Sequence, residues 1–292
     1  MSIIARVADF WIGRKRVSDP AALAAARAEV SGLKPIVLVI GGSRGIGPAL
    51  AERFARGGAD VAIVARTPEL LNAVASGLAA NTGRRPLVLV RDVTQEGAAE
   101  AIGEDVRRAG YYVDVLINNA GMGLAGPFLS HDPKSIAALL ALDIETPTRL
   151  MRHFLPGMCA RRHGGVLNVA SLGGAVPGPN QASYYASKAY VLSLTEAVAN
   201  EIAGLGVRVC ALAPGPVDTG FHEDMGAERS LYRRILPATS PQHVARTAYF
   251  GFTLGQRVIV PGLVNAAGYA LLRLLPHPIT VPLMAVLLKR RA

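Results

Sequence analysis

Residues 36–47 read IVLVIGGSRGIG, an apolar run that passes directly into a glycine-rich loop. A short, unbroken run of β-branched and leucine side chains indicates a strand buried on both faces. A glycine loop between such a strand and a helix is typical of dinucleotide sites, because glycine lets the backbone approach a pyrophosphate at the helix N-terminus. Turn glycines without a ligand are the alternative. The residues of the predicted cofactor loop are Gly41, Ser43, Arg44, Gly45, Ile46 and Gly47.

Further apolar runs alternate with helical stretches along the chain. Strands are expected at 61–65, 87–90, 113–117, 166–169 and 207–212, with a long helical region at 133–160. This alternation indicates βαβ units with right-handed crossovers. We predict the α/β class: a Rossmann-like, doubly wound parallel sheet in a single domain over 35–262. A helical N-terminal extension at 1–34, with helices at 3–11 and 20–30, and an apolar, basic C-terminal extension at 263–292 flank it.

The chain has 292 residues and a formal net charge of +10. No Asp or Glu follows Glu228, so the basicity is concentrated near the C-terminus. No nucleic-acid-binding motif accompanies it; we expect no nucleic-acid partner and favour an anionic membrane surface or an acidic ligand. Two cysteines, Cys159 and Cys210, make no disulfide framework and indicate a reducing, cytoplasmic setting. No cluster has metal-ligand spacing, so no metal is expected.

Ser171, Tyr184 and Lys188 form a second pattern. Tyrosine and lysine at i, i+4 share one helix face, so the ammonium can lie beside the phenol. Because a nearby positive charge favours phenolate, we expect Lys188 to lower the pKa of Tyr184. Such a phenol can pass a proton to or from a carbonyl or alcohol oxygen. Tyr185 is the alternative phenol, but only Tyr184 stands four positions before the lysine.

The residue after the second strand discriminates between NAD and NADP. A carboxylate there would bind the ribose 2′-hydroxyl and repel a 2′-phosphate. This chain instead has Arg66, with Arg44 in the glycine loop, and two guanidinium groups suit a phosphate dianion. We predict NADP(H) in preference to NAD(H). A solvated surface arginine is the alternative for Arg66.

Several motifs in one order resemble the short-chain dehydrogenase/reductase (SDR) family, NADP-preferring type, over about residues 35–262. They are the loop at 41–47, Asp92-Val93, Asn118-Asn119-Ala120-Gly121, Ser171, Tyr184-x-x-x-Lys188 and Pro214-Gly215. The resemblance implies an oxidoreductase that interconverts a ketone and a secondary alcohol. Ser171 and Tyr184 would then bind the substrate oxygen, with Tyr184 as general acid or base. The implied cofactor contacts are Asp92, Val93, Asn119, Ala120, Gly121, Tyr184, Lys188, Pro214, Gly215, Val217 and Thr219.

One catalytic position departs from the family pattern. The family usually has an asparagine in the helix after the fourth strand, where it supports a water chain that runs from the lysine. Alignment places Asp143 there. Aspartate keeps an acceptor oxygen, loses the amide donor and adds a charge that would favour the Lys188 ammonium. The aspartate has three interpretations: the change is tolerated and alters the proton relay, it reduces activity, or the alignment register is wrong.

Segments outside these motifs indicate the class of substrate and what the terminal segments contact. Residues 220–241 lie where the family places a substrate lid, and their apolar side chains suit a hydrophobic carbonyl or alcohol from lipid metabolism; a plain surface loop is the alternative. Residues 3–11 and 263–292 could bind a membrane surface peripherally or pack on the domain, the pocket or a second subunit of a homo-oligomer. An alcohol dehydrogenase working oxidatively and a non-catalytic dinucleotide-binding scaffold or sensor are the alternative functions.

Overall fold

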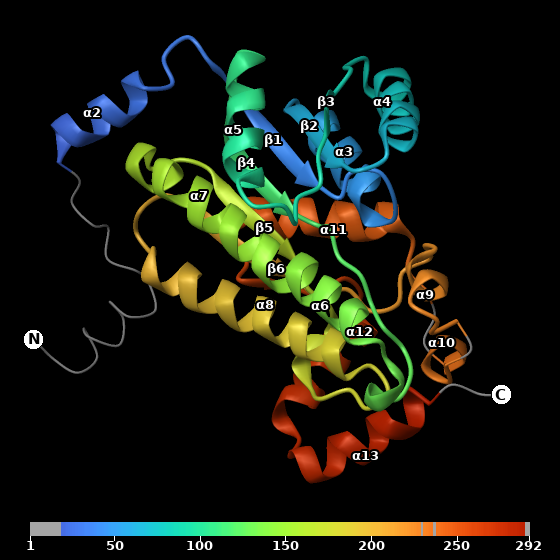
Figure 1. Cartoon of the computed structure of the whole chain (residues 1–292). Coiled ribbons are helices and arrows are strands. Elements are labelled where there is room, and N and C mark those ends of the chain that lie inside the picture. The colour runs from blue at the N-terminus through green and yellow to red at the C-terminus, as the bar shows by residue number, and fades with distance from the viewer. Residues whose placement is uncertain (1–18, 229, 236–237, 290–292) are drawn as a thin grey trace, which may run out of the picture.

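The computed structural model describes residues 19–228, 230–235 and 238–289. Seven parallel strands form one sheet in the order β3-β2-β1-β4-β5-β6-β7 (Figure 1). The strands are β1 (Lys34–Ile40), β2 (Asp60–Ala65), β3 (Leu87–Val90), β4 (Tyr111–Asn118), β5 (Gly165–Val169), β6 (Arg208–Leu212) and β7 (Val258–Ile259). The predicted Rossmann-like parallel sheet is confirmed.

Helices cover both faces of this sheet. One layer contains α3 (Ile46–Arg56), α4 (Pro68–Thr82) and α11 (Pro241–Thr253), and the other contains α5 (Ala98–Arg108), α7 (Thr146–Arg161) and α8 (Ala182–Glu201). Outside these layers lie α2 (Pro20–Ala28), α6 (Pro133–Leu140), α9 (Phe221–Asp224), α10 (Tyr232–Ile235), α12 (Leu263–Leu274) and α13 (His277–Leu287). None of the described helices is both long enough and apolar enough to cross a bilayer.

The central strand β1 feeds both hydrophobic layers. Val37 and Val39 join the core on the side of α3, α4 and α11, whereas Ile36, Leu38 and Ile40 join the core on the side of α5 and α7. Successive side chains of a strand point to opposite faces, so a strand covered on both sides must be apolar throughout. This explains the unbroken apolar run at 36–40.

The N-terminal extension is described from Asp19 onwards. The Asp19 side chain accepts a hydrogen bond from the backbone N–H of Ala21 at 3.0 Å, and Pro20 occupies the first helical turn of α2. An aspartate cap followed by proline satisfies the helix start. The predicted helix at 20–30 is therefore present and ends at Ala28, while the predicted helix at 3–11 lies outside the described residues.

The strand order reverses between β1 and β4, and this junction positions the loops that follow. From β1 the chain winds outward through β2 and β3, then returns to place β4 on the other side of β1. The backbone N–H of Asn119, just after β4, donates to the carbonyl of Ile40 at 3.1 Å. Loops diverge at such a switch point and leave a crevice for a ligand.

Leu38 lies in the central strand β1, and its substitution tests this description of the hydrophobic core. Its side chain is fully buried, so Leu38→Ala should lower the free energy of unfolding by about 2–5 kcal/mol through lost burial and a residual cavity. Urea denaturation would measure the change. The matched control is Leu254→Ala at the exposed end of α11, which should change stability by less than about 0.5 kcal/mol. Equal effects of the two substitutions would contradict this description of the core.

Candidate active site

The glycine loop packs directly against the loop that follows β4. Gly41 has φ 79°, and a side chain there would bring Cβ within 2.7 Å of the Cα of Ala120. A Cβ on Gly47 would lie 2.1 Å from the carbonyl oxygen of Gly41. The amide of Asn119 donates to that same oxygen at 2.8 Å. The two loops therefore form one cradle, which any larger residue at these glycines would fill.

The start of α3 is open to an anion. Its N-cap is Gly45, with φ 64°, and no side-chain hydrogen bond within the described chain caps this helix. A Cβ on Gly45 would lie 4.0 Å from the methyl group of Thr219, so the segment after β6 borders the loop. Uncapped N–H groups at a helix start bind phosphate well. The cradle fits the pyrophosphate of a dinucleotide, with Ser43 and Ile46 beside it in the sequence.

The two predicted adenosine-side arginines, Arg44 and Arg66, are exposed. Asp92 accepts hydrogen bonds from the Thr94 hydroxyl at 2.8 Å and the Thr94 N–H at 3.0 Å. Partial burial raises the pKa of Asp92, but the Thr94 hydrogen bonds and the positive charge of Arg66 outweigh it and leave that pKa below its ordinary value. Arg66 and Asp92 therefore lie within electrostatic reach of each other, with Val93 next to Asp92 in the chain.

Tyr184 is buried near the start of α8, with only 9% of its surface exposed. The Ser171 hydroxyl, just beyond β5, hydrogen-bonds the phenol. Lys188 lies one turn further along α8, and its Nζ is 5.7 Å from the centroid of the Tyr184 ring. The structure thus brings the three predicted catalytic residues together. Tyr185 is also buried, with its ring 6.1 Å from that of Tyr184.

Asp143 contacts Lys188 directly. Its Oδ2 lies 3.0 Å from Lys188 Nζ, and its side chain is completely buried. The backbone N–H of Met122 donates to Asp143 Oδ1 at 2.8 Å, and the Ser187 hydroxyl donates to Oδ2 at 3.3 Å. Lys188 also donates to the carbonyl of Val169 at 3.4 Å. Asp143 therefore lies beside Lys188 and contacts its ammonium directly.

A π-helical turn at Ala141–Glu145 carries Asp143. The sequence predicted one helical region over 133–160, whereas the structure has α6, this π-turn and α7 in succession. A π-turn inserts an extra residue into a helix and is often found at functional sites. Here the inserted turn lies beside α8. Gly121 completes the contact, since a Cβ there would meet Lys188 Nζ at 3.0 Å and Asp143 Oδ1 at 3.4 Å.

The pKa of Tyr184 shifts upwards, not downwards. Burial raises it, the Ser171 hydrogen bond lowers it, and the Asp143 carboxylate raises it again, with a net increase. The predicted lowering of this pKa by Lys188 is therefore wrong. The physical reason is desolvation: burial disfavours the charged phenolate, and the Asp143 carboxylate beside Lys188 adds to the increase.

A layer of apolar side chains covers the phenol. The Phe221 ring lies 5.6 Å from that of Tyr184, and Met225 belongs to the same buried cluster. Met284 and Leu288, from α13 and its C-cap, complete this cluster. The predicted lid at 220–241 thus contacts Tyr184. Apart from its apolar character, the local sequence of α13 did not indicate that this helix would pack in the cluster around Tyr184.

Some buried polar atoms in this region have no hydrogen-bond partner among the described residues. They are Nε2 of Gln181, which caps α8 just before the tyrosine pair, and Oγ1 of Thr280, one turn before Met284 in α13. Buried polar groups normally find partners, so such atoms are available to a ligand.

The segment after β6 carries the remaining predicted cofactor contacts. Gly215, which follows Pro214, lies against the Asn265 side chain of α12. Val217 is buried and forms an isolated parallel bridge with Thr239.

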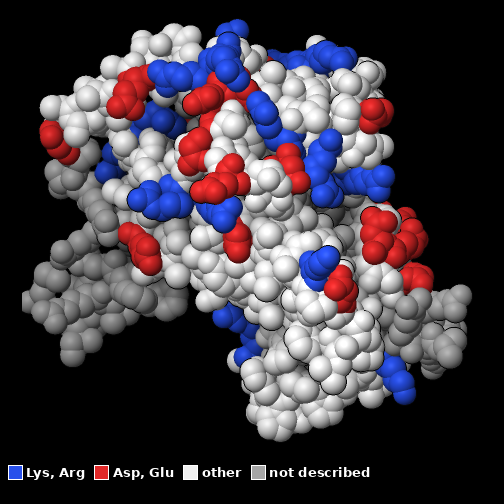
Figure 2. All heavy atoms as spheres, in the orientation of Figure 1, with Lys and Arg blue, Asp and Glu red and all other residues white. Residues whose placement is uncertain are grey.

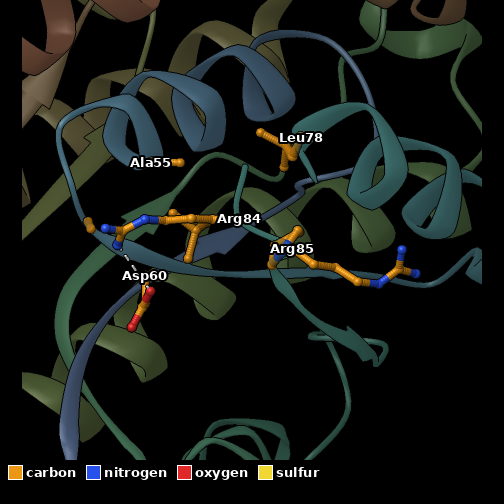
Figure 3. A pocket seen from close by; sticks show the side chains of 8 residues that line it. Ala55, Asp60, Leu78, Arg84 and Arg85 are labelled. Carbon is orange, nitrogen blue, oxygen red and sulfur yellow. Dashed lines mark hydrogen bonds and ion pairs between the residues drawn. The ribbon is translucent and has the colours of Figure 1, made fainter. Parts of the chain in front are cut away.

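Two cavities lie away from Tyr184. One, of about 10 Å³, lies beside Arg84 and Asp60 near the amino ends of β2 and β3 (Figure 3). This volume admits about one water molecule. The other is a groove of about 680 Å³ between α5 and α7. No group of three or more His, Cys, Asp or Glu side chains in the described ranges could hold a metal ion.

Comparison with known proteins establishes the family. Residues 35–230 match the family described as short chain dehydrogenase, so the chain belongs to the short-chain dehydrogenase/reductase family of oxidoreductases. A short chain dehydrogenase of Pseudocercospora fijiensis is 34% identical over 185 residues, covering 62% of this chain but only 59% of that protein. The 3-oxoacyl-acyl-carrier-protein reductase of Escherichia coli is 32% identical over 184 residues, covering 63% and 74%.

Solved structures agree in fold. A short-chain dehydrogenase from Sphingobium yanoikuyae in complex with NADPH is 31% identical, with a TM-score of 0.73 and coverage of 82% of this chain and 91% of that one. The bulky-bulky ketone specific alcohol dehydrogenase from Comamonas testosteroni is 28% identical, with a TM-score of 0.68 and coverage of 83% and 95%. A Burkholderia phymatum family member in complex with NAD has a TM-score of 0.74, 22% identity and coverage of 82% and 93%, a likeness of fold alone.

Asp143→Asn tests the electrostatics of the site. Without the carboxylate, the Lys188 charge is no longer offset, so the pKa of Tyr184 should fall relative to the native protein. Ultraviolet difference titration of phenolate, with and without the additional change Tyr184→Phe, would isolate this group. Asp105→Asn on α5 is the control and should leave the titration of Tyr184 where it is. An unchanged or higher pKa in Asp143→Asn would refute the charge-offset explanation.

Proposed function

We propose that this oxidoreductase uses NADP(H) to reduce a hydrophobic ketone to a secondary alcohol, with Tyr184 as the general acid. The observation that carries the proposal is the buried Tyr184 phenol, which hydrogen-bonds Ser171 and lies one helical turn from the Asp143–Lys188 ion pair. A phenol in these surroundings has few roles other than proton transfer.

The residues that would hold the cofactor surround the switch point of the sheet. The glycine loop and the start of α3 would receive the pyrophosphate, and Asp92 and Val93 would border the adenine. Asn119, Ala120 and Gly121 would flank the adenosine ribose, while Lys188 would bind the nicotinamide ribose. The segment with Pro214, Gly215, Val217 and Thr219 would hold the carboxamide. When bound, the nicotinamide supplies or accepts the hydride.

The raised pKa of Tyr184 suits a phenol that enters a reduction protonated, and the same phenol would act as the base in the reverse reaction. A phenol whose pKa lies above its ordinary value stays protonated at neutral pH, and a protonated phenol can donate to a carbonyl oxygen that is becoming an alkoxide. Ser171 would hold that oxygen by a second hydrogen bond. The ion pair with Asp143 holds the Lys188 side chain in place, and the Ser187 hydroxyl extends the polar chain behind it.

The apolar cover supports a hydrophobic substrate. Phe221, Met225, Met284 and Leu288 leave the phenol surrounded mainly by hydrocarbon, which suits an acyl, steroid-like or other lipid-like carbonyl compound. The neighbour from Comamonas testosteroni carries the description of an enzyme for bulky ketones, which supports the same substrate class. A role in lipid metabolism follows as part of this proposal.

Two other functions remain as alternatives. An alcohol dehydrogenase working oxidatively would use Tyr184 as the base that takes the proton of the alcohol. A dinucleotide-binding scaffold or sensor would need no proton donor, and the ion pair of Asp143 is the feature that would suit it. We also propose a cytoplasmic homo-oligomer; the free thiols of Cys159 and Cys210 support the reducing compartment.

Arg66→Ala tests the cofactor preference. Loss of one charge-assisted hydrogen bond to the 2′-phosphate should weaken NADPH binding about tenfold or more and leave NADH binding unchanged. Cofactor fluorescence titration measures both affinities. Arg85→Ala, which removes an exposed arginine before the amino end of β3, is the matched control. Tighter binding of NADH than of NADPH by the native chain would refute the preference, as would equal losses of both in Arg66→Ala.

Tyr184→Phe tests the mechanism, with Tyr185→Phe as the neighbouring control. Removing the proton donor should lower kcat on a panel of hydrophobic ketones by about 10²–10⁴-fold, whereas Tyr185→Phe should retain most turnover. NADPH consumption is followed by absorbance, and NADPH binding should survive in both variants. Turnover that survives Tyr184→Phe would overturn the mechanism. Tight NADPH binding without turnover of any ketone or alcohol would instead favour the scaffold.

A further inference from the structure

Helix α12 presents an apolar stripe to the outside of the molecule. Leu263 is 91% exposed, Leu271 is 55% exposed and Leu274 is 82% exposed. Their spacing of three or four residues, or multiples of it, places them on one helix face, where exposed Ala267 and Ala270 fill the gaps. The opposite face holds Tyr269, which is buried against α8 and β6 side chains. The exposed stripe therefore has no role in the packing of the described domain.

Helix α13 is apolar on both of its faces. Thr280, Met284 and Leu288 recur every four residues and face inward, and the latter two pack in the cluster that covers Tyr184. Ile279, Leu283 and Val286 face outward and are 56%, 47% and 60% exposed. An all-round apolar helix is typical of a buried or membrane-associated element. Each of these two consecutive helices therefore exposes several apolar side chains, more than the scattered single residues of ordinary surfaces.

The C-terminal segment that carries these two helices is basic. No Asp or Glu occurs between residues 229 and 292, whereas Arg and Lys recur throughout that stretch. Arg273 pairs with Glu196 of α8 at 2.9 Å, while Arg257 and Lys289 are exposed. Figure 2 shows that the foot of the molecule, where α13 lies in Figure 1, is mostly uncharged; Lys and Arg lie at its edge, and acidic side chains lie above and beside it. The excess of Lys and Arg over residues 229–292 favours an anionic surface as the partner.

We propose that α12 and α13 dock the protein on an anionic lipid bilayer, with both helices lying in the plane of the interface. The helices have 12 and 11 residues, too few to span a bilayer but enough to bury one face at its surface. Basic residues beside an apolar face add attraction to anionic headgroups. A second copy of the chain would bring two acid-free, basic segments together, so charge disfavours it as the occupant.

Docking in this way would bring the cover of the phenol to the membrane. The outer face of α13 would contact lipid, while Met284 and Leu288 on its inner face contact the cluster around Tyr184. An apolar ketone dissolved in the bilayer would then lie one helix away from the site. The docking itself does not depend on the proposed activity and is tested without it.

Vesicle flotation with the full chain tests the proposal. The native protein should float with vesicles of phosphatidylcholine and phosphatidylglycerol, bind pure phosphatidylcholine more weakly, and lose affinity as salt is raised. Leu271→Glu with Leu274→Glu should lower the partition coefficient at least about tenfold, because two side chains no longer enter hydrocarbon. Circular dichroism and NADPH titration establish that this variant is folded.

The matched control is Leu254→Glu. Leu254 is a comparably exposed leucine, but it lies at the end of α11 and not on α12 or α13. It should bind vesicles as the native protein does. Native-like vesicle binding by the α12 variant would overturn the proposal and assign binding to another part of the chain. Absence of binding to anionic vesicles, or equal binding to both compositions, would also overturn it. A drop in oligomeric state of the α12 variant in sedimentation velocity, without vesicle binding by the native chain, would identify a subunit interface instead.

Discussion

Parallel strands present all of their carboxyl ends at one edge of a sheet, and the chemistry of this protein depends on that constraint. The glycine loop after β1, the Asn119–Gly121 segment after β4, Ser171 after β5 and Gly215 after β6 all emerge there. Each comes from a different part of the chain, yet the sheet ladder brings them together. Because β1 and β4 stay paired up to Ile40 and Asn118, the loops that follow them start side by side and approach as closely as the contact between Gly41 and Ala120.

Within this edge, the Asp143–Lys188 ion pair sets the electrostatics. Both side chains are buried, and a buried pair is tolerated only when further hydrogen bonds satisfy its remaining atoms. Met122, Ser187 and the carbonyl of Val169 supply those bonds. The pair offsets the lysine charge, so the neighbouring phenol keeps its proton more firmly than a tyrosine beside an isolated ammonium would. The Asp143 carboxylate thus contributes to the raised pKa of the neighbouring phenol.

The cover of the phenol joins the site to the outer surface. Phe221 and Met225 from the lid and Met284 from α13 exclude water from Tyr184, which is the physical cause of its raised pKa. The same helix α13 exposes Ile279, Leu283 and Val286 on its other side. One apolar helix therefore has two surroundings, the cluster over the phenol and the exterior.

Local patterns in the sequence determined the strands, the glycine loop and the Tyr184–Lys188 spacing, because strand alternation and the helical i, i+4 relation depend only on neighbouring residues. The order of those motifs was enough to indicate the family. Only the tertiary structure decided the direction of the Tyr184 pKa, the π-turn that carries Asp143 and the packing of α13 over the site. Asp143 and Lys188 are 45 residues apart, and Met284 is a hundred residues from Tyr184. Burial and charge compensation across such separations arise from packing, which no local period encodes.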